Sequence, residues 1–266
     1  MLWNVVLIGI VEGITEWLPI SSTGHMLLLD QWMPLPMSES FKEMFFVVIQ
    51  LGAILAVVTE FWKRLWPVAI TDGRLRPKWD VLHLWYTVAI GCFPAGVLGL
   101  LLDEYLEAHF GTPRTIAAML ILYGVLFIAI ESSSRTPTVY ATSALPFGTV
   151  LAIGLFQALA MIPGTSRSGA TIIGALLLGV SRTTASEFSF FLAIPTMLGA
   201  STLKLVKFGF AFQFDELCVL FVGMVTAFAV SLLSIRFLMG FTRRHSFKLF
   251  GWYRIALGLA VLAFMT

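Results

Sequence analysis

Long apolar runs recur along the whole chain, separated by short polar segments. A helix needs about 20 predominantly apolar residues to cross the ~30 Å hydrocarbon core of a bilayer. Six runs meet this length and predict membrane-spanning helices, at residues 43–62, 81–102, 115–131, 187–206, 217–237 and 250–265. The pattern therefore predicts an all-α polytopic membrane protein, with a single integral membrane domain over residues 1–266.

Two further apolar regions are each broken in the middle by polar residues and proline. Non-helical backbone at membrane depth is tolerated only where protein or a water-filled cavity surrounds it. Each region therefore predicts a re-entrant hairpin, that is, two half-helices joined by a polar turn. The first comprises residues 2–18 and 26–33 around Pro19, and the second comprises residues 148–162 and 170–180 around Pro163 and Gly164.

The two broken regions repeat each other at a fixed spacing. Pro163 follows Pro19 by 144 residues, and Glu187 follows Glu43 by the same 144 residues. The shared offset predicts two homologous halves, 1–131 and 145–266, each a re-entrant hairpin plus three transmembrane helices. Three crossings separate the hairpins, so they enter from opposite faces, which makes the halves an inverted-topology repeat. The same offset pairs Ser21 with Thr165, Ser22 with Ser166 and Ala56 with Ala200.

Composition supports membrane insertion and excludes a nucleic-acid partner. The chain is 58% hydrophobic and 12% charged, with mean hydropathy +0.91, whereas soluble domains carry about 25% charged residues. The net charge is only +2, and the basic residues are scattered over loops instead of forming a stripe that could follow phosphates. Composition therefore predicts membrane lipid as a partner.

The distribution of Lys and Arg gives the orientation. Eleven basic residues are expected on the side away from the first hairpin and four on the other, and cytoplasmic loops carry the excess of positive charge. Both termini and the mouth of the first hairpin are therefore expected to face outward. The eleven are Lys63, Arg64, Arg74, Arg76, Lys78, Arg135, Arg182, Arg236, Arg243, Arg244 and Lys248, and the four are Lys42, Arg114, Lys204 and Lys207.

The first break carries the stretch EGITEWLPISSTGH, residues 12–25. Glu12 and Glu16 are four apart and share a helical face, and unpaired charges are costly inside a bilayer. A divalent cation such as Mg²⁺ would suit two carboxylates and phosphate oxygens; alternatively, one is protonated and serves as a general acid. Ser22 is a nucleophile candidate with His25 as its base, although Ser and Thr here also suit helix capping.

The second break carries PGTSRSGAT, residues 163–171. Arg167 is the one arginine expected at an internal break, and guanidinium binds phosphate in a bidentate manner. Ser166, Ser168 and Thr171 add hydroxyl groups, and Gly169 permits close approach at a helix N-terminus, which attracts anions. The alternative is that Arg167 only neutralises one of the two carboxylates. Together the breaks predict phosphoryl chemistry within the membrane.

These motifs resemble those of a known family. EGITEWLPISSTGH is similar to the EGxTExLPxSSTGH signature, and PGTSRSGAT to the PGxSRSxxT signature, of bacterial undecaprenyl-diphosphate phosphatases of the bacitracin-resistance type. FxxVIQLGAILAV at 45–57 and SRxxASEFSFFLAIP at 181–195 extend the resemblance over essentially the whole chain. It implies removal of the terminal phosphate of undecaprenyl diphosphate, which recycles the lipid carrier for peptidoglycan synthesis. It also implies a divalent cation, Mg²⁺ or Ca²⁺, and a site opening to the periplasmic side of the bacterial inner membrane.

The resemblance also assigns roles to residues. It implies function at Glu12, Glu16, Ser22, His25, Ser166, Arg167 and Thr171. In the mechanism we predict, Glu12 and Glu16 hold the metal on the diphosphate, while Arg167 and the N–H groups from Ser166 to Gly169 stabilise the transferring phosphoryl group. Ser22 attacks, and His25 takes its proton and later activates water. His25 as nucleophile and direct attack by water stay open.

Transport is the competing class of function. Inverted repeats with broken helices are typical of secondary transporters, so a transporter or flippase of a lipid-linked or other anionic substrate would share this architecture. The Ser22–His25 pair favours the enzyme, because binding alone requires neither a nucleophile nor a base. The oligomeric state is left open, a homodimer included.

Overall fold

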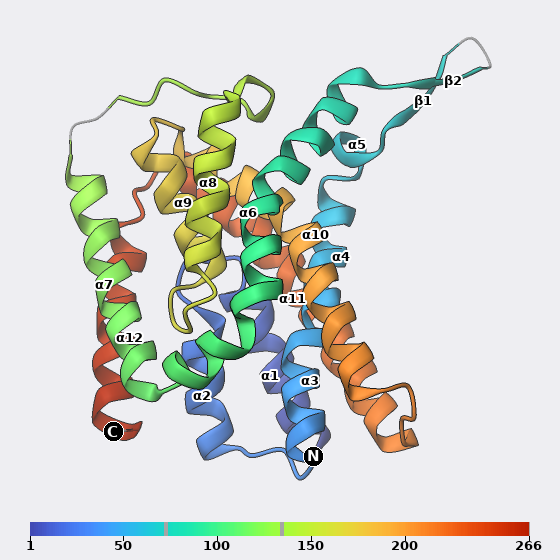
Figure 1. The fold of residues 1–266 in the computed structure, drawn as a ribbon, viewed down its shortest axis with the longest axis vertical. Helices are drawn as coiled ribbons and strands as arrows, with labels where there is room; N and C mark the ends of the chain where they lie inside the picture. The colour runs from blue at the N-terminus through green and yellow to red at the C-terminus, as the bar shows by residue number, and fades with distance from the viewer. Residues whose placement is uncertain (72–73, 134–135, 266) are drawn as a thin grey trace.

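A computed structural model of the chain describes residues 1–71, 74–133 and 136–265 (Figure 1). Within these ranges the protein is helical, apart from one small hairpin of strands. The elements are α1 (Leu2–Thr15), α2 (Ser22–Trp32), α3 (Glu39–Val48), α4 (Gln50–Glu60), α5 (Trp62–Leu65), β1 (Val68–Thr71), β2 (Arg74–Pro77), α6 (Trp79–Phe110), α7 (Pro113–Ser132), the 3₁₀ turn η1 (Thr142–Ala144), α8 (Phe147–Leu159), α9 (Arg167–Leu177), α10 (Arg182–Phe208), α11 (Phe214–Thr242) and α12 (Lys248–Met265).

The six predicted spans are confirmed as helices long and apolar enough to cross a membrane. The first consists of α3 and α4 together, Glu39–Glu60, and the other five lie in α6, α7, α10, α11 and α12. The predicted all-α class therefore holds for a multi-pass membrane protein. The apolar pattern located the spans but not all their ends, since α6 continues to Phe110, beyond the predicted end at residue 102.

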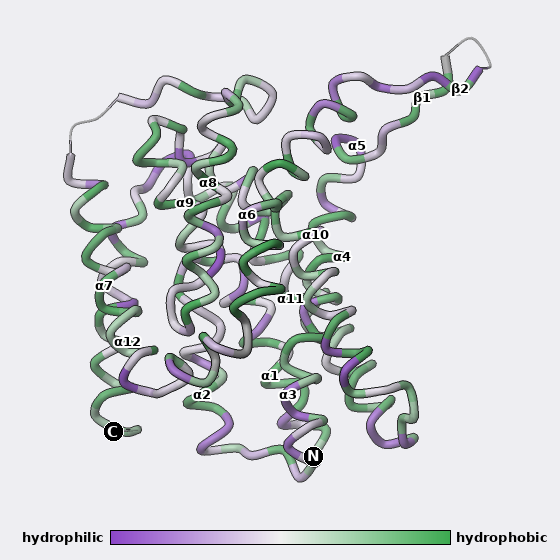
Figure 2. Tube along the Cα trace, viewed as in Figure 1, coloured by the Kyte–Doolittle hydropathy of each residue, from purple (hydrophilic) through white to green (hydrophobic). Residues whose placement is uncertain are grey.

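The apolar pattern did not indicate the hairpin of β1 and β2. These strands pair antiparallel, from Val68 opposite Pro77 to Thr71 opposite Arg74, and carry part of the basic loop between α5 and α6. Figure 1 shows the hairpin at the opposite end of the molecule from both chain termini. Hydrophobic positions run along the spans, as Figure 2 shows, and this hairpin contains hydrophilic ones.

Two pairs of short helices occupy the places where broken apolar runs were found. α1 and α2 are joined by a turn over residues 16–21, and α8 and α9 by a turn over residues 160–166. Seen in Figure 1, α1 starts at the end of the molecule that holds the N-terminus, while α8 starts at the far end. Both turns therefore reach the interior from opposite directions.

Small residues allow the helices behind these turns to pack closely. Gly9 and Gly13 of α1 lie against α11, and Gly154 of α8 lies against Gly91 of α6. Gly124 of α7 faces Gly251 of α12 in the same way. Close backbone approach over small residues is a common way for helices to associate inside membranes. The contacts of α1 with α11 and of α8 with α6 fix the two helices that lead into the turns.

Candidate active site

Each interior turn ends in a serine that caps the following helix in a left-handed conformation. Ser21 has φ of 74° and Ser166 has φ of 71°, the two non-glycine residues with positive φ in the described part of the chain. The Ser21 hydroxyl accepts from Gly24 N at 3.5 Å, and the Ser166 hydroxyl accepts from Gly169 N at 3.2 Å. Non-glycine residues held at positive φ tend to cluster at functional sites.

The caps correct the predicted alignment of the two turns. Ser21 and Ser166 hold the same position, which gives an offset of 166 − 21 = 145 instead of 144. The second turn has one extra residue between its proline and its cap, so Ser22 corresponds to Arg167 and not to Ser166. The two turns therefore place a hydroxyl and a guanidinium at matching positions after the cap.

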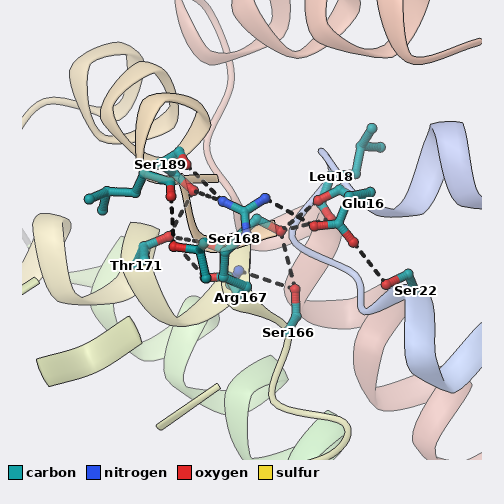
Figure 3. A network of polar contacts seen from close by, with 11 residues as sticks. Glu16, Leu18, Ser22, Ser166, Arg167, Ser168, Thr171 and Ser189 are labelled. Carbon is teal, nitrogen blue, oxygen red and sulfur yellow. Dashed lines mark hydrogen bonds and ion pairs between the residues drawn. The ribbon is translucent and has the colours of Figure 1, made fainter. Parts of the chain in front are cut away.

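An ion pair joins the two turns (Figure 3). Arg167 Nη2 donates to Glu16 Oε1 at 3.0 Å, and Ser22 Oγ donates to Glu16 Oε2 at 3.0 Å. Arg167 Nη1 donates to the Ser189 carbonyl at 2.7 Å. The Arg167 and Glu16 side chains are only 11% and 7% exposed. The structure thus brings together three predicted site residues, Glu16, Ser22 and Arg167.

Two hydroxyl groups in the first turns of α9, those of Ser168 and Thr171, bind protein atoms. Ser168 Oγ donates to the carbonyl oxygens of Glu16 and Leu18, at 3.1 and 3.4 Å, and lies 3.2 Å from Ser166 Oγ. Thr171 Oγ1 lies 2.7 Å from Ser189 Oγ and donates to the Arg167 carbonyl at 2.9 Å. Ser168 and Thr171 are buried. Their binding of phosphate stays a prediction; in this structure their hydroxyl groups contact the first turn, Ser189 and the backbone of Arg167.

His25 does not contact Ser22 in the way the sequence suggested. Its Nδ1 lies 2.7 Å from the Ser21 carbonyl and its Nε2 lies 2.7 Å from Tyr253 Oη. A carbonyl can only accept, so Nδ1 carries the hydrogen and Nε2 of the neutral ring accepts from the tyrosine hydroxyl. The hydrogen bond that Ser22 does make goes to Glu16. The predicted serine–histidine pair is therefore replaced by a serine–glutamate contact.

Glu12 is the most deeply buried of the predicted site carboxylates. It is 1% exposed, and its Oε1 has no hydrogen-bond partner, while the Gln50 side chain is within its reach. A buried carboxylate oxygen without a partner fits a bound cation. Among the described residues, no cluster of three or more His, Cys, Asp or Glu is present. Glu12 and Glu16 would therefore have to share a hard cation with substrate oxygens and water, as Mg²⁺ sites commonly do.

Three further residues at this site were not predicted from the sequence: Ser189 of α10, and Tyr253 and Arg254 of α12. Ser189 holds Arg167, and Tyr253 holds His25. Arg254 is fully buried and donates to carbonyl oxygens of both turns, so Arg167 is not the only arginine at the breaks. A signal was available for Arg254, because an ionisable residue inside an apolar span indicates function. Ser189 gave no such signal.

Comparison with known proteins supports the family resemblance that the two sequence motifs indicated. Residues 5–260 match the family model described as Bacitracin resistance protein BacA. An undecaprenyl-diphosphatase of Enterococcus faecalis is 60% identical over 97% of this chain and 95% of its own length. Undecaprenyl-diphosphatases of Desulfitobacterium hafniense and Lachnoclostridium phytofermentans are 55% and 54% identical, over 100% and 99% of this chain and 96% of each relative. The chain belongs to the Bacitracin resistance protein BacA family.

Proposed function

We propose that this membrane enzyme hydrolyses undecaprenyl diphosphate to undecaprenyl phosphate and inorganic phosphate. Its relatives bear the name undecaprenyl-diphosphatase at up to 60% identity over nearly the full chain. The product is the lipid carrier that peptidoglycan synthesis uses again, and renewing it counters bacitracin. The observation that carries the proposal is the Glu16–Arg167 pair with Ser22 bound to it, which combines groups from both halves at one point.

Arg167 and the start of α9 form the proposed phosphate site. A diphosphate would compete with Glu16 for the guanidinium, whose other nitrogen is kept in place by Ser189. Phosphoryl transfer mainly requires oriented hydrogen-bond donors that stabilise the negative charge on the transferring group. In this proposal Ser166 and Gly169 shape the N-terminus of α9, and Ser168 and Thr171 keep Arg167 oriented.

Ser22 is the proposed nucleophile. Its oxygen attacks the terminal phosphorus, the bond to the bridging oxygen breaks, and undecaprenyl phosphate leaves. Glu16 Oε2 accepts the Ser22 hydrogen bond and is therefore positioned to receive its proton. Water then hydrolyses the phosphoserine, and His25 on the next turn of α2 is the proposed base for that water. The Ser21 carbonyl fixes the orientation of the imidazole, and Nε2, which accepts from Tyr253 in this structure, is the nitrogen that would accept from the water instead.

Glu12 and Glu16 are the residues that would hold Mg²⁺ or Ca²⁺. A bound cation would neutralise part of the diphosphate charge and orient its oxygens. The unpartnered Glu12 Oε1 supports this assignment. Gln50 would then keep the Glu12 carboxylate in place.

In the membrane, we propose that α1–α2 and α8–α9 are re-entrant hairpins of an inverted repeat. The capped serines and the opposite directions of the two pairs support this arrangement (Figure 1). The excess of basic residues on the β1–β2 side supports a cytoplasmic position for that side, with both termini outside. Arg135, one of the eleven basic residues counted there, lies outside the described residues. The active site would then open toward the periplasm of the bacterial inner membrane.

Cysteine labelling in intact cells tests this orientation. Cys92 and Cys218 are first replaced by alanine, and one cysteine is then introduced at exposed Phe210 or exposed Arg244. A membrane-impermeant maleimide should modify Phe210→Cys and leave Arg244→Cys unmodified until the cells are opened. Modification of Arg244→Cys alone in intact cells would reverse the proposed orientation.

Phosphate release by purified protein in detergent tests the activity. Inorganic phosphate should appear with undecaprenyl diphosphate as the only substrate, stop on addition of a chelator, and resume when Mg²⁺ or Ca²⁺ is restored. Release that continues unchanged with chelator would exclude the metal role. Absence of release with every metal would exclude the enzyme and leave transport of the lipid.

A further inference from the structure

Arg254 lies in the interior of the bundle, between the two interior turns. It is on α12, and its side chain is 0% exposed. Arginine is almost never fully buried unless its charge is paired. In the described part of the chain, however, the hydrogen bonds of Arg254 go to backbone carbonyl oxygens and not to a carboxylate.

These carbonyl oxygens come from both halves of the protein. Nη2 donates to Thr165 O at 2.8 Å and to Gly164 O at 2.9 Å, in the second turn. Nη1 donates to Pro19 O at 3.3 Å, in the first turn. The guanidinium also lies over the Tyr123 ring of α7, 5.6 Å from its centroid. One side chain therefore links the two turns to each other and to the α7–α12 pair.

The bound carbonyls of the two turns lie one or two residues before the capping serines. Thr165 is followed by Ser166, and Pro19 lies two residues before Ser21. In a trans peptide the C=O and the next N–H point in opposite directions. With the Thr165 carbonyl held toward Arg254, the Ser166 N–H is directed away from it. Arg254 thus helps to fix the peptide orientation at the position where Ser166 adopts φ of 71°.

The charge of Arg254 also matters for an anionic substrate. Glu16 neutralises Arg167, whereas Arg254, among the described residues, contacts only carbonyl dipoles and the face of a ring. Around the turns this gives two carboxylates, Glu12 and Glu16, and two guanidinium groups. A diphosphate at the site would gain from the second cation, since charges interact strongly where water is scarce.

We propose that Arg254 is a positioning residue for the phosphatase reaction, which locks the two turns in register and adds positive potential at the diphosphate site. The inference rests on the proposed active site at these turns. Replacing Arg254 would let Thr165, Gly164 and Pro19 move, and a misplacement of ~1 Å can cost about 10²-fold in rate. The loss should fall on kcat more than on KM, because the lost orientation serves the transition state.

The test compares Arg254→Met, Arg254→Lys and the control Arg236→Met in the phosphate-release assay. Arg236 sits on α11 and pairs with Glu60 at the surface, outside the network at the turns. Folded fraction is measured in parallel by size exclusion and thermal unfolding in detergent. We expect kcat to fall by about 10²-fold in Arg254→Met, by about tenfold in Arg254→Lys, which keeps the charge, and less than twofold in Arg236→Met.

Two outcomes separate this inference from the site assignment. If Arg254→Met folds and its kcat is within threefold of the wild-type value, the positioning role is wrong. If Arg254→Met does not fold, a kcat of Arg254→Lys within threefold of the wild-type value overturns the role instead. Arg167→Met is run alongside. If it too keeps wild-type activity, the proposed site at the turns is wrong; if it is inactive while both Arg254 variants are active, only the role of Arg254 is wrong.

Discussion

Ser22 illustrates how local geometry selects one partner from several candidates. His25 lies three residues further along the chain, yet the cap formed by Ser21 turns the start of α2 so that the Ser22 hydroxyl reaches back to Glu16. His25 instead forms a hydrogen bond with the carbonyl of Ser21, which lies four positions before it. The sequence motif placed these groups close together, but which of them bond depends on the positive φ of Ser21.

Replacing Ser22 by alanine tests its role as nucleophile. Ser22→Ala should lower kcat at least 10²-fold, on the order expected when a group that takes part directly in the chemistry is lost. Thr23→Ala is the matched control, since Thr23 is the neighbouring hydroxyl residue, is exposed, and lies outside the Glu16–Arg167 network. Phosphate release by the purified variants is the measurement. Near-normal turnover of Ser22→Ala would exclude the serine and favour attack by His25 or by water.

The individual helices show what an apolar pattern can and cannot predict. The six spans were correctly located because 20 or so apolar residues in a row have few other structures available in a membrane. Their ends were less certain, because polar residues such as those near the end of α6 do not interrupt a helix that continues beyond the bilayer. The one-residue insertion in the second turn was also missed, since matching prolines suggested an ungapped repeat.

Close helix contacts make a prediction at this scale. A methyl group at Gly154 of α8 would overlap the backbone carbonyl of Gly91 in α6, whereas one at Gly148 of the same helix meets open space. Overpacking of this kind costs about 1–3 kcal/mol. Gly154→Ala should therefore lower the thermal unfolding midpoint in detergent, while Gly148→Ala should leave it unchanged or raise it slightly, as alanine favours helix. Equal midpoints for the two variants would show that α6 and α8 do not pack this closely.

The whole molecule brings together groups that are far apart in sequence. Glu16 and Arg167 are separated by 151 residues. The Ser22–Glu16 pair belongs to the first turn, whereas the Arg167 guanidinium follows the second turn. Matching positions after the two caps hold Ser22 and Arg167, so the two turns have complementary chemistry. The sequence predicted this division of roles from the repeat and the two motifs. It could not predict the support from Ser189 of α10, which approaches the site only through the packing of distant helices. Arg254 stands out in the sequence as an ionisable residue inside an apolar span, but its contacts with the turns depend on the same packing.

The proposed reaction requires that the two turns form one active site, and a double-mutant cycle in the phosphate-release assay tests this requirement. Glu16→Gln and Arg167→Met are measured singly and together in purified, folded protein. Residues that act as a unit are strongly non-additive. Each single change should lower kcat/KM by at least about 10²-fold. The kcat/KM of the double variant should lie within about threefold of that of the less active single variant. Losses that multiply, to about 10⁴-fold or more in the double variant, would show that the two groups act independently and contradict a shared site.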